Sequence, residues 1–203
     1  MSTVIVDCGL GNLHSVVRGC RKCGQDPVVT SDAQLVESAE RLILPGVGAF
    51  GKAMQSIDAG GLRKPILNYI ASGRPFLGIC LGLQLLFEQS EEFGTPKGLG
   101  VLQGTVKRFT CENPVPHVGW NRIRFVETDH LSLYSGIDSG EWVYFVHSFY
   151  VEDIGLKYTT TVAEYGGLEF TASICSGNVH ATQFHPEKSG EVGLKFISNF
   201  LSI

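Results

Sequence analysis

Short apolar runs alternate with amphipathic segments up to about residue 90. The runs are rich in β-branched side chains and are bounded by glycine, proline or polar residues, which is typical of buried strands. Between them, apolar side chains recur every three or four positions, which predicts helices. Strands are expected at residues 3–7, 27–30, 41–45 and 74–79, and helices at 12–23, at 62–72 and directly after Cys80, with a further short helix capped by Ser31 or Asp32. This alternation predicts an α/β fold in which a parallel sheet is covered by helices on both faces.

From about residue 100 the pattern changes to strand-like runs separated by turns, with little helical periodicity between them. The runs are GTVKRF (104–109), NRIRF (121–125), WVYFVHSFY (142–150), KYTTTVAEY (157–165), EFTASIC (169–175) and NVHATQF (178–184). They predict an antiparallel or mixed extension of the sheet. Apolar residues at helical spacing predict a closing helix over 191–200. Because no linker, repeat or low-complexity stretch interrupts this order, we expect a single domain spanning residues 1–203.

The composition is that of a folded chain with a sizeable core, since 43% of the residues are apolar, 18% are charged and the net charge is −4. No cluster of Lys and Arg stands out, so a nucleic-acid partner is not expected. No apolar run reaches the roughly 18 residues that indicate a membrane span, and the first residues lack the pattern of a signal peptide. We therefore expect a cytoplasmic protein whose six cysteines are free thiols.

The sequence indicates no cofactor and no metal site. Cys20 and Cys23 form a C-x-x-C pair, but no second pair of ligands follows at the spacing of a zinc site, and both fall inside a predicted helix. We interpret them as structural residues. The segment GLGNLH after the first strand has His14 where a dinucleotide-binding loop needs its third glycine, which argues against a nucleotide cofactor.

Cys80 stands between two glycines at the junction of a predicted strand and a predicted helix. The stretch Gly78-Ile79-Cys80-Leu81-Gly82 fits the G-x-nucleophile-x-G pattern of a nucleophile held on a sharp strand-to-helix turn. Glycines leave room for the strained turn and for the close approach of the helix. The N-terminus of that helix would favour the thiolate, which is the nucleophilic form. Taken alone, the stretch is equally compatible with a buried structural cysteine.

His185 and Glu187 supply the other groups that a cysteine nucleophile requires. They lie two positions apart in FHPE, so in an extended segment, which Pro186 favours, their side chains would point to the same side. The carboxylate could then orient the imidazole while the second ring nitrogen faces the thiol. FHPE alone could equally be a surface turn. In combination with the elbow it predicts a triad of Cys80, His185 and Glu187.

The motifs GICLGLQLLFE (78–88) and FHPE (184–187) resemble those of the class I glutamine amidotransferases, whose triad is Cys-His-Glu. GLGNLHSV, LILPGVGAF, PHVGWN, YFVHSFY and QFHPEKSG narrow the resemblance to one branch, the glutaminase subunits of imidazole glycerol phosphate synthases, over residues 9–193. One departure is Cys8, where tyrosine or threonine is expected. The resemblance implies a three-layer fold with a mostly parallel central sheet, and hydrolysis of L-glutamine through a thioester on Cys80. It also implies transfer of ammonia to a separate (β/α)₈-barrel cyclase subunit in histidine biosynthesis.

The resemblance further implies roles for residues outside the triad. The backbone N–H of Leu81 and the PGVG loop, at Val47 and Gly48, would form the oxyanion hole that stabilises a tetrahedral intermediate. The residues implied to bind glutamine are Gly46, Gln84, Glu92, Ser148 and Phe149. The segment PHVGWN would lie on the face that meets the partner, with contacts from His117, Trp120 and Asn121.

Three other functions are compatible with parts of the pattern. The chain could be the glutaminase of another synthase, such as that for anthranilate, aminodeoxychorismate or pyridoxal phosphate, although PHVGWN argues against these. It could be a cysteine peptidase-like hydrolase with the same elbow, which would ignore glutamine analogues. A regulatory subunit with a decayed site is the third alternative, and the presence of all three triad residues argues against it.

Overall fold

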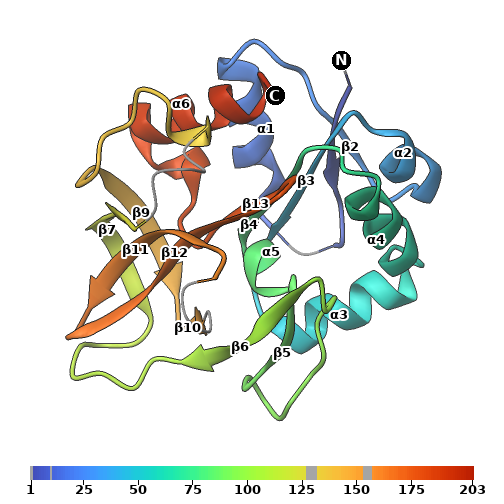
Figure 1. The fold of residues 1–203 in the computed structure, drawn as a ribbon. Coiled ribbons are helices and arrows are strands. Elements are labelled where there is room, and N and C mark those ends of the chain that lie inside the picture. The colour runs from blue at the N-terminus through green and yellow to red at the C-terminus, as the bar shows by residue number, and fades with distance from the viewer. Residues whose placement is uncertain (1, 10, 127–131, 153–156) are drawn as a thin grey trace.

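A computed structural model describes residues 2–9, 11–126, 132–152 and 157–203 of the chain. An eight-stranded sheet runs through the molecule in the order β2-β1-β3-β4-β13-β12-β11-β8 (Figure 1). The parallel half comprises β2 (Val28–Thr30), β1 (Thr3–Val6), β3 (Arg41–Gly46), β4 (Phe76–Cys80) and β13 (Val179–Thr182). The antiparallel half comprises β12 (Leu168–Ser176), β11 (Thr159–Tyr165) and the short β8 (Arg124–Phe125). The predicted mostly parallel sheet with an antiparallel extension is therefore confirmed.

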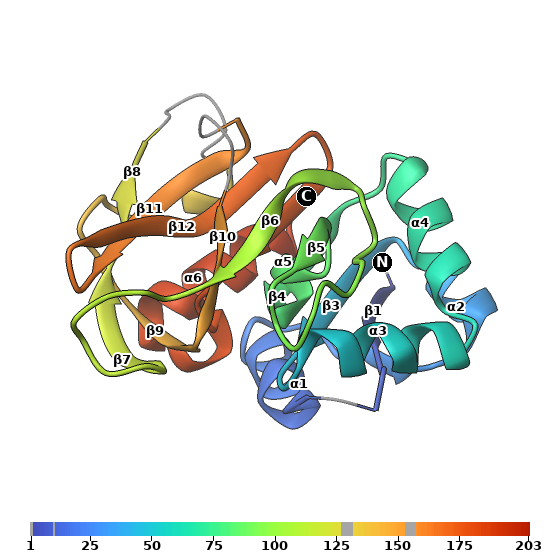
Figure 2. The same cartoon turned by 90° about the horizontal axis from the view of Figure 1, so that it is seen from below.

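Helices cover both faces of the parallel half. The helices α1 (Leu13–Lys22) and α6 (Gly190–Phe200) lie on one face, and α2 (Ala33–Ser38), α3 (Phe50–Ala59) and α4 (Arg63–Ala71) lie on the other (Figures 1 and 2). Alternate residues of β3 serve the two cores: Leu42 and Leu44 pack with α2, α3 and α4, whereas Ile43 packs with α1 and α6. A strand buried on both faces reads as a continuous apolar run, which is why the sequence pattern identified it.

Two helix starts are explained by their capping residues. The side chain of Asn12 accepts a hydrogen bond from the backbone N–H of Ser15 at the start of α1. Asp32 accepts from the N–H groups of Gln34 and Leu35 at the start of α2. Of the two caps that the sequence offered for this helix, Asp32 is the one used. The helix α3 was not predicted, although its buried residues recur at helical spacing.

The helix predicted after Cys80 is much shorter than expected, and this part of the prediction was wrong. The helix α5 (Leu81–Gln84) makes one turn, and β5 (Phe87–Ser90) follows it. The carbonyl groups of Leu85 and Leu86, which would continue the helix, instead accept hydrogen bonds from the N–H groups of residues 99, 101 and 102. Tertiary pairing therefore overrides the helical pattern of this segment.

The strand-rich half is also more divided than the sequence suggested. β5 pairs with β6 (Leu102–Arg108), which pairs with β10 (Phe149–Glu152), in a separate three-stranded sheet. β7 (His117–Arg122) and β9 (Trp142–His147) form a two-stranded ribbon. The run 142–150 thus divides between two sheets at Ser148. These strands flank the central sheet rather than extend it, and they form the wall opposite Cys80.

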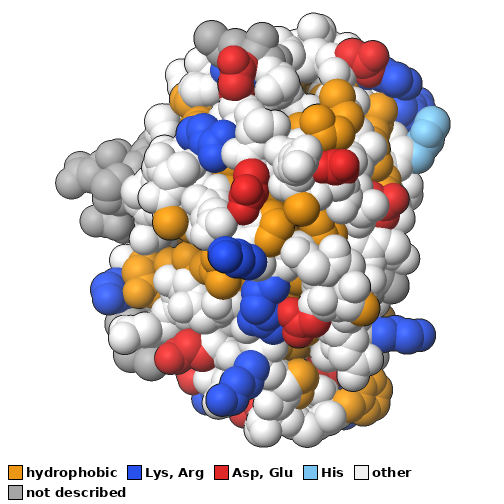
Figure 3. Space-filling model, turned by 90° about the vertical axis from the view of Figure 1, so that its right-hand side faces the viewer, with side chains coloured by type: hydrophobic (Ala, Val, Ile, Leu, Met, Phe, Trp, Pro, Cys, Tyr) orange, Lys and Arg blue, Asp and Glu red, His pale blue; other side chains and the backbone are white. Residues whose placement is uncertain are grey.

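The surface charges and the cysteines agree with what the composition indicated. Acidic and basic side chains are interspersed on the face viewed in Figure 3. Among the described residues, no helix is long and apolar enough to cross a membrane. All six cysteines lie in the described part of the chain and are free thiols, as predicted.

Candidate active site

Cys80 ends β4 in a strained backbone conformation. Its φ of 55° and ψ of −107° lie in a region that side-chain-bearing residues rarely occupy. A Cβ atom added at Gly82 would lie 1.8 Å from the carbonyl oxygen of Leu44, and one at Gly78 would lie 2.7 Å from that of Gly82. The two glycines therefore allow α5 to pack directly against β3 and β4. This close packing turns the chain sharply and directs the sulfur away from the strand, as the elbow pattern predicted.

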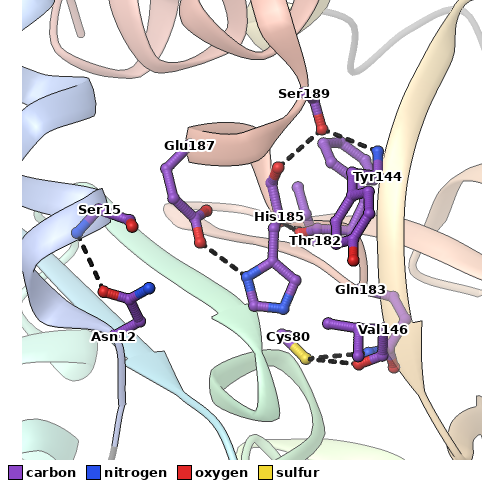
Figure 4. Close-up of polar contacts among 11 residues, drawn as sticks. Asn12, Ser15, Cys80, Tyr144, Val146, Thr182, Gln183, His185, Glu187 and Ser189 are labelled. Carbon is purple, nitrogen blue, oxygen red and sulfur yellow. Dashed lines mark hydrogen bonds and ion pairs between the residues drawn. The ribbon is translucent and has the colours of Figure 1, made fainter. Parts of the chain in front are cut away.

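His185 follows β13, the strand beside β4, so the sheet itself brings it next to Cys80. Its backbone is fixed on both sides. The N–H of His185 donates to the carbonyl of Tyr144 (2.9 Å), and its carbonyl accepts from the Ser189 hydroxyl (2.7 Å). The same hydroxyl accepts from the N–H of Tyr144 (3.0 Å), which closes the arrangement visible in Figure 4. Ser189 thus anchors His185 to β9.

Glu187 orients the imidazole, but by a different local geometry from the one expected. His185 is extended, as predicted, but Pro186 begins a single 3₁₀ turn, Pro186–Lys188, so the extended segment does not continue to Glu187 and that part of the prediction is wrong. Proline is well suited to the first position of such a turn because it lacks an N–H group. The turn directs a Glu187 carboxylate oxygen to within 2.7 Å of His185 Nδ1. The Glu187 side chain is only 2% exposed, so little water competes for this contact.

The second nitrogen of His185 points toward the Cys80 sulfur (Figure 4). This atom, Nε2, is buried and has no hydrogen-bond partner among the described residues. Burial lowers the pKa of His185, but the Cys80 sulfur and the Glu187 carboxylate outweigh burial and raise the pKa to about 10. At neutral pH the ring is therefore an imidazolium, with the Glu187 carboxylate accepting from Nδ1 and the Cys80 sulfur in front of Nε2. It holds a proton that can be given to a leaving group beside the sulfur.

A cavity of about 280 Å³ opens beside Cys80. Ten residues line it: Gly48, Cys80, Leu81, Gln84, Glu92, Pro116, Val146, His147, Ser148 and Phe149. It therefore brings together six of the residues that the resemblance assigned to the oxyanion hole or to glutamine. Gln84, Glu92 and Ser148 add polar groups to an otherwise largely apolar lining, which suits a small ligand with a few polar atoms.

The PGVG loop reaches this cavity at one position. Gly48 lines it with a φ of 102°, a conformation that favours glycine. Gly46 lies behind the cavity wall, where it pairs with Cys80 in the sheet and packs against the Leu81 side chain. The side chain of Val47 is partly exposed. Of these three loop residues, Gly48 is the one that contributes directly to the cavity surface.

Glu92 connects the cavity to the end of the PGVG loop. Its carboxylate accepts a hydrogen bond from the N–H of Phe50 (2.5 Å), the first residue of α3. A carboxylate is favourable there because the first N–H groups of a helix have no partner within the helix. Glu92 also lines the cavity, so an acidic side chain forms part of its wall.

A buried chain of amides joins the far wall of the cavity to the sulfur. Gln84 Nε2 donates to the carbonyl of Phe149 (3.0 Å) and to Gln183 Oε1 (2.9 Å). Gln183 Nε2 in turn lies 3.6 Å from Cys80 Sγ. Sequence reasoning gave Gln183 no role. It stands two positions before His185, and only the pairing of β13 with β4 reveals its neighbour.

The residues of PHVGWN separate into buried and exposed positions. His117 is buried and its Nδ1 lies 3.1 Å from Nε2 of His147, so its ring is not available to a partner's surface. Trp120 is 52% exposed. The side chain of Asn121 donates to the carbonyl of Glu164 across to β11 (2.7 Å).

The His117–His147 pair makes the folded chain sensitive to acid. Burial lowers the pKa of His117 to about 4 and, with the charges of neighbouring histidines, that of His147 to about 3. Below pH 6.5 both imidazoles are protonated in the unfolded chain but stay neutral in the folded chain. The free energy of unfolding therefore falls by up to about 1.4 kcal/mol per pH unit for each histidine. The raised pKa of folded His185 opposes this trend only near pH 6.5, and the opposition fades at lower pH, where the unfolded imidazole is protonated as well. We expect the melting temperature to fall steeply between pH 6.5 and 4.5.

A substitution at His117 tests this source of acid sensitivity. The ring of His117 stacks between Phe145 and Tyr165, so phenylalanine preserves the packing. We expect His117→Phe to have a lower melting temperature than the wild type at pH 7, because His147 Nε2 loses its hydrogen-bond donor. On acidification, its melting temperature should fall less than that of the wild type. The exposed His14 provides the matched control, and His14→Phe should keep the wild-type slope. A wild-type slope in His117→Phe would contradict the assignment.

Comparison with known proteins identifies relatives along the whole chain. The family model "Glutamine amidotransferase class-I" matches residues 4–203. "Imidazole glycerol phosphate synthase subunit HisH" of Syntrophotalea carbinolica is 49% identical, with 97% of this chain and 98% of that protein covered. The protein of the same name from Methanothermobacter thermautotrophicus is also 49% identical, covering 98% and 97%. Among solved structures, "Structure of PurLQS from Thermotoga maritima" is similar in fold, with a TM-score of 0.77, 19% identity, and coverage of 99% and 97%.

Proposed function

The chain belongs to the class I glutamine amidotransferases, and from that premise we propose that it is the glutaminase subunit of an imidazole glycerol phosphate synthase. The observation that carries the proposal is the arrangement of Cys80, His185 and Glu187 beside a small cavity, in a chain that relatives of that name match over nearly its whole length. Residues 1–203 act as one glutaminase domain. The free thiols are consistent with the reducing cytoplasm, where we place the activity.

The first half of the reaction releases ammonia. The Cys80 thiolate attacks the side-chain amide carbon of L-glutamine, and the carbonyl oxygen becomes an oxyanion facing the Leu81 N–H and the PGVG loop at Val47 and Gly48. His185 Nε2 gives its proton to the departing nitrogen, and the carbon–nitrogen bond breaks. A γ-glutamyl thioester remains on Cys80.

The second half returns the site to its starting state. Water attacks the thioester carbon and gives a proton to His185, whose ring Glu187 holds in place. The carbon–sulfur bond breaks, glutamate leaves, and Cys80 is again a thiolate beside an imidazolium. The sum is L-glutamine plus water to glutamate plus ammonia, with no cofactor consumed.

The cavity surface matches the two ends of the substrate. We place the α-amino group at the Glu92 carboxylate and the α-carboxylate at the backbone of Ser148 and Phe149, with Gly46 supporting the loop from behind. Gln84 has both amide N–H groups occupied by protein acceptors, so its carbonyl oxygen is the atom left to accept a hydrogen bond from glutamine.

The ammonia acceptor lies on a separate cyclase subunit in this proposal. The exposed side of β7, with Val118 and Trp120, offers apolar area for such a contact, and exposed tryptophans are frequent in interface hot spots. Asn121 lies beside them, whereas His117 supports the strand from below. Because ammonia is protonated in water, a direct passage between the subunits preserves its reactivity.

Partner dependence is the test of this function. We expect the isolated chain to hydrolyse glutamine slowly and the complex with the cyclase subunit, with its acceptor site occupied, to do so at least about 100-fold faster. The physical reason is that the PGVG loop must present its N–H groups correctly, and a few kcal/mol separate complete from incomplete oxyanion holes. Glutamate release is measured for the chain alone and for its complex with the cyclase subunit. The cyclase subunit alone is the control. Equal turnover with and without the partner would contradict the proposal.

A further inference from the structure

Gln183 touches the reacting atom of the site. It follows β13 directly, and the register Thr182↔Ile79 between β13 and β4 sets the next residue of each strand side by side, which are Gln183 and Cys80. The Gln183 side chain is completely buried, and its Nε2 lies 3.6 Å from Cys80 Sγ (Figure 4). This is hydrogen-bond distance for a sulfur acceptor.

The backbone carbonyl of Phe149 determines which end of the Gln183 amide faces the sulfur. The backbone carbonyl of Phe149 can only accept, so the Gln84 atom 3.0 Å away must be the amide nitrogen. The second hydrogen of that nitrogen then points to Gln183, which must present its oxygen at 2.9 Å. Gln183 therefore directs its own N–H group at the sulfur. An amide flip at Gln183 would set two N–H groups against each other.

The same carbonyl is held from its other side by the histidine pair. His147 Nδ1 lies 2.8 Å from the Phe149 oxygen and must carry the proton, since the oxygen only accepts. His147 Nε2 is then an acceptor, and His117 Nδ1 donates to it at 3.1 Å. The donor and acceptor roles of the two imidazoles and the two side-chain amides between β7 and the sulfur are thus each determined by the hydrogen bonds that they make.

We propose that Gln183 is a further catalytic residue, a permanent hydrogen-bond donor that stabilises the Cys80 thiolate, with Gln84 as the positioning residue that fixes its amide. The inference rests on Cys80 being the nucleophile of the proposed function. His185 must give up its proton during the reaction, whereas an amide keeps its hydrogen throughout. Gln183 therefore supports the sulfur when the thioester breaks and the thiolate leaves, at the stage when the imidazole is still accepting a proton from water.

The reactivity of the sulfur measures this contact without requiring turnover. Cys80 alkylation by iodoacetamide is followed by mass spectrometry of its peptide over a range of pH, because the thiolate is the form that reacts. The titratable groups that face the sulfur or its cavity in the described structure are His185, His147 and Glu92, and they are left unchanged. Alkylation of Cys111, a partly exposed thiol remote from the cavity, is the internal reference in each sample.

Three substitutions by side chains of similar length separate hydrogen-bond donation from packing. Gln183→Met removes the donor, and we expect the pH of half-maximal Cys80 alkylation to rise by about one unit, with a rate about tenfold lower at a pH one unit below the wild-type midpoint. Gln183→Glu replaces the donor with a carboxylate and should produce a larger rise. Gln84→Met frees the Gln183 amide to turn and should produce a smaller one. The Cys111 profile stays unchanged in all three.

A purely structural role predicts a different result. The variants would then melt at lower temperature and keep the wild-type Cys80 profile, which would overturn the proposal. Should the Gln183 variants not fold, Gln84→Met carries the same test. The side-chain amide signal of Gln183 in the NMR spectrum gives a direct test. In the wild type its chemical shift must change over the pH range in which Cys80 ionises. In Cys80→Ala this change must be absent. Because neither readout needs glutamine turnover, failure of the proposed function is distinguishable from failure of this contact.

Discussion

Cys80→Ala should abolish glutamine-dependent synthesis by the complex, with a loss of at least about 10³-fold, while synthesis from added ammonium continues at the wild-type rate. The sulfur is the atom to which the glutamyl group is transferred, and no neighbouring side chain can replace it. His185 and Glu187 would remain, but they would have no nucleophile to activate. Ammonium reaches the acceptor without this chemistry, so its use depends on the fold and the interface alone.

Two measurements make the result specific to the sulfur. Product formation by the complex is compared with glutamine and with ammonium as nitrogen source, and a glutamine-mimicking electrophile should add its mass to the Cys80 peptide of wild type and leave Cys80→Ala unlabelled. Cys111→Ala is the matched control, since it removes another free thiol and should keep both activities. Loss of both activities in Cys80→Ala would show that this cysteine is structural. Retention of both would exclude it as the nucleophile.

The parallel half of the fold was predictable because its information is local. Strands such as β3 are apolar on both faces, and their flanking helices carry caps such as Asp32 that can be recognised within a few residues. The strand-rich half was predictable as strands but not as sheets. Which strands pair depends on contacts between distant segments, and the division of 142–150 between two sheets has no signal in the alternation itself.

The failure of the helix prediction after Cys80 has the same origin. Leu81, Leu85 and Leu86 have helical spacing and are all buried, as a helix would require. The chain leaves the helix because residues 99–102 satisfy the backbone carbonyls at 85 and 86. A pairing partner fifteen positions away cannot be identified from periodicity.

The site shows the same division between local and distant information. Cys80, His185 and Glu187 could be proposed from the sequence because each stands in a short pattern that carries its own chemistry, even though the backbone at Glu187 is a 3₁₀ turn and not extended. Gln183 and His147 were not identified. Their roles come from what lies across the sheet or the cavity, and only the register of β13 on β4 and the position of β9 reveal them.

Gly82→Ala should cost the chain about 3 kcal/mol or more, and lower its melting temperature by about 10 °C. The added Cβ would stand 1.8 Å from the Leu44 carbonyl oxygen, a backbone atom in the middle of the sheet that cannot rotate away. Either α5 or β3 must shift by more than an ångström. Cys80 connects β4 to α5 and pairs with Gly46 of β3, so the sulfur moves when either element shifts, and misplacement of this size reduces catalysis on the order of 100-fold. Thermal unfolding and glutaminase activity of the complex measure the two effects.

Gly51→Ala is the matched control, because Gly51 also occupies the second position of a helix, α3, close to the cavity. There the new Cβ would lie 3.5 Å from Pro96, an ordinary van der Waals distance, so alanine should be tolerated and should favour the helix by up to about 1 kcal/mol. The contrast isolates the close approach of α5 to β3 from the general cost of changing a glycine. A Gly82→Ala protein that melts at the wild-type temperature and retains activity would show that the elbow tolerates a looser packing than the structure describes. The orientation of the Cys80 sulfur toward the cavity would then depend on other contacts, such as those with Gln183 and His185.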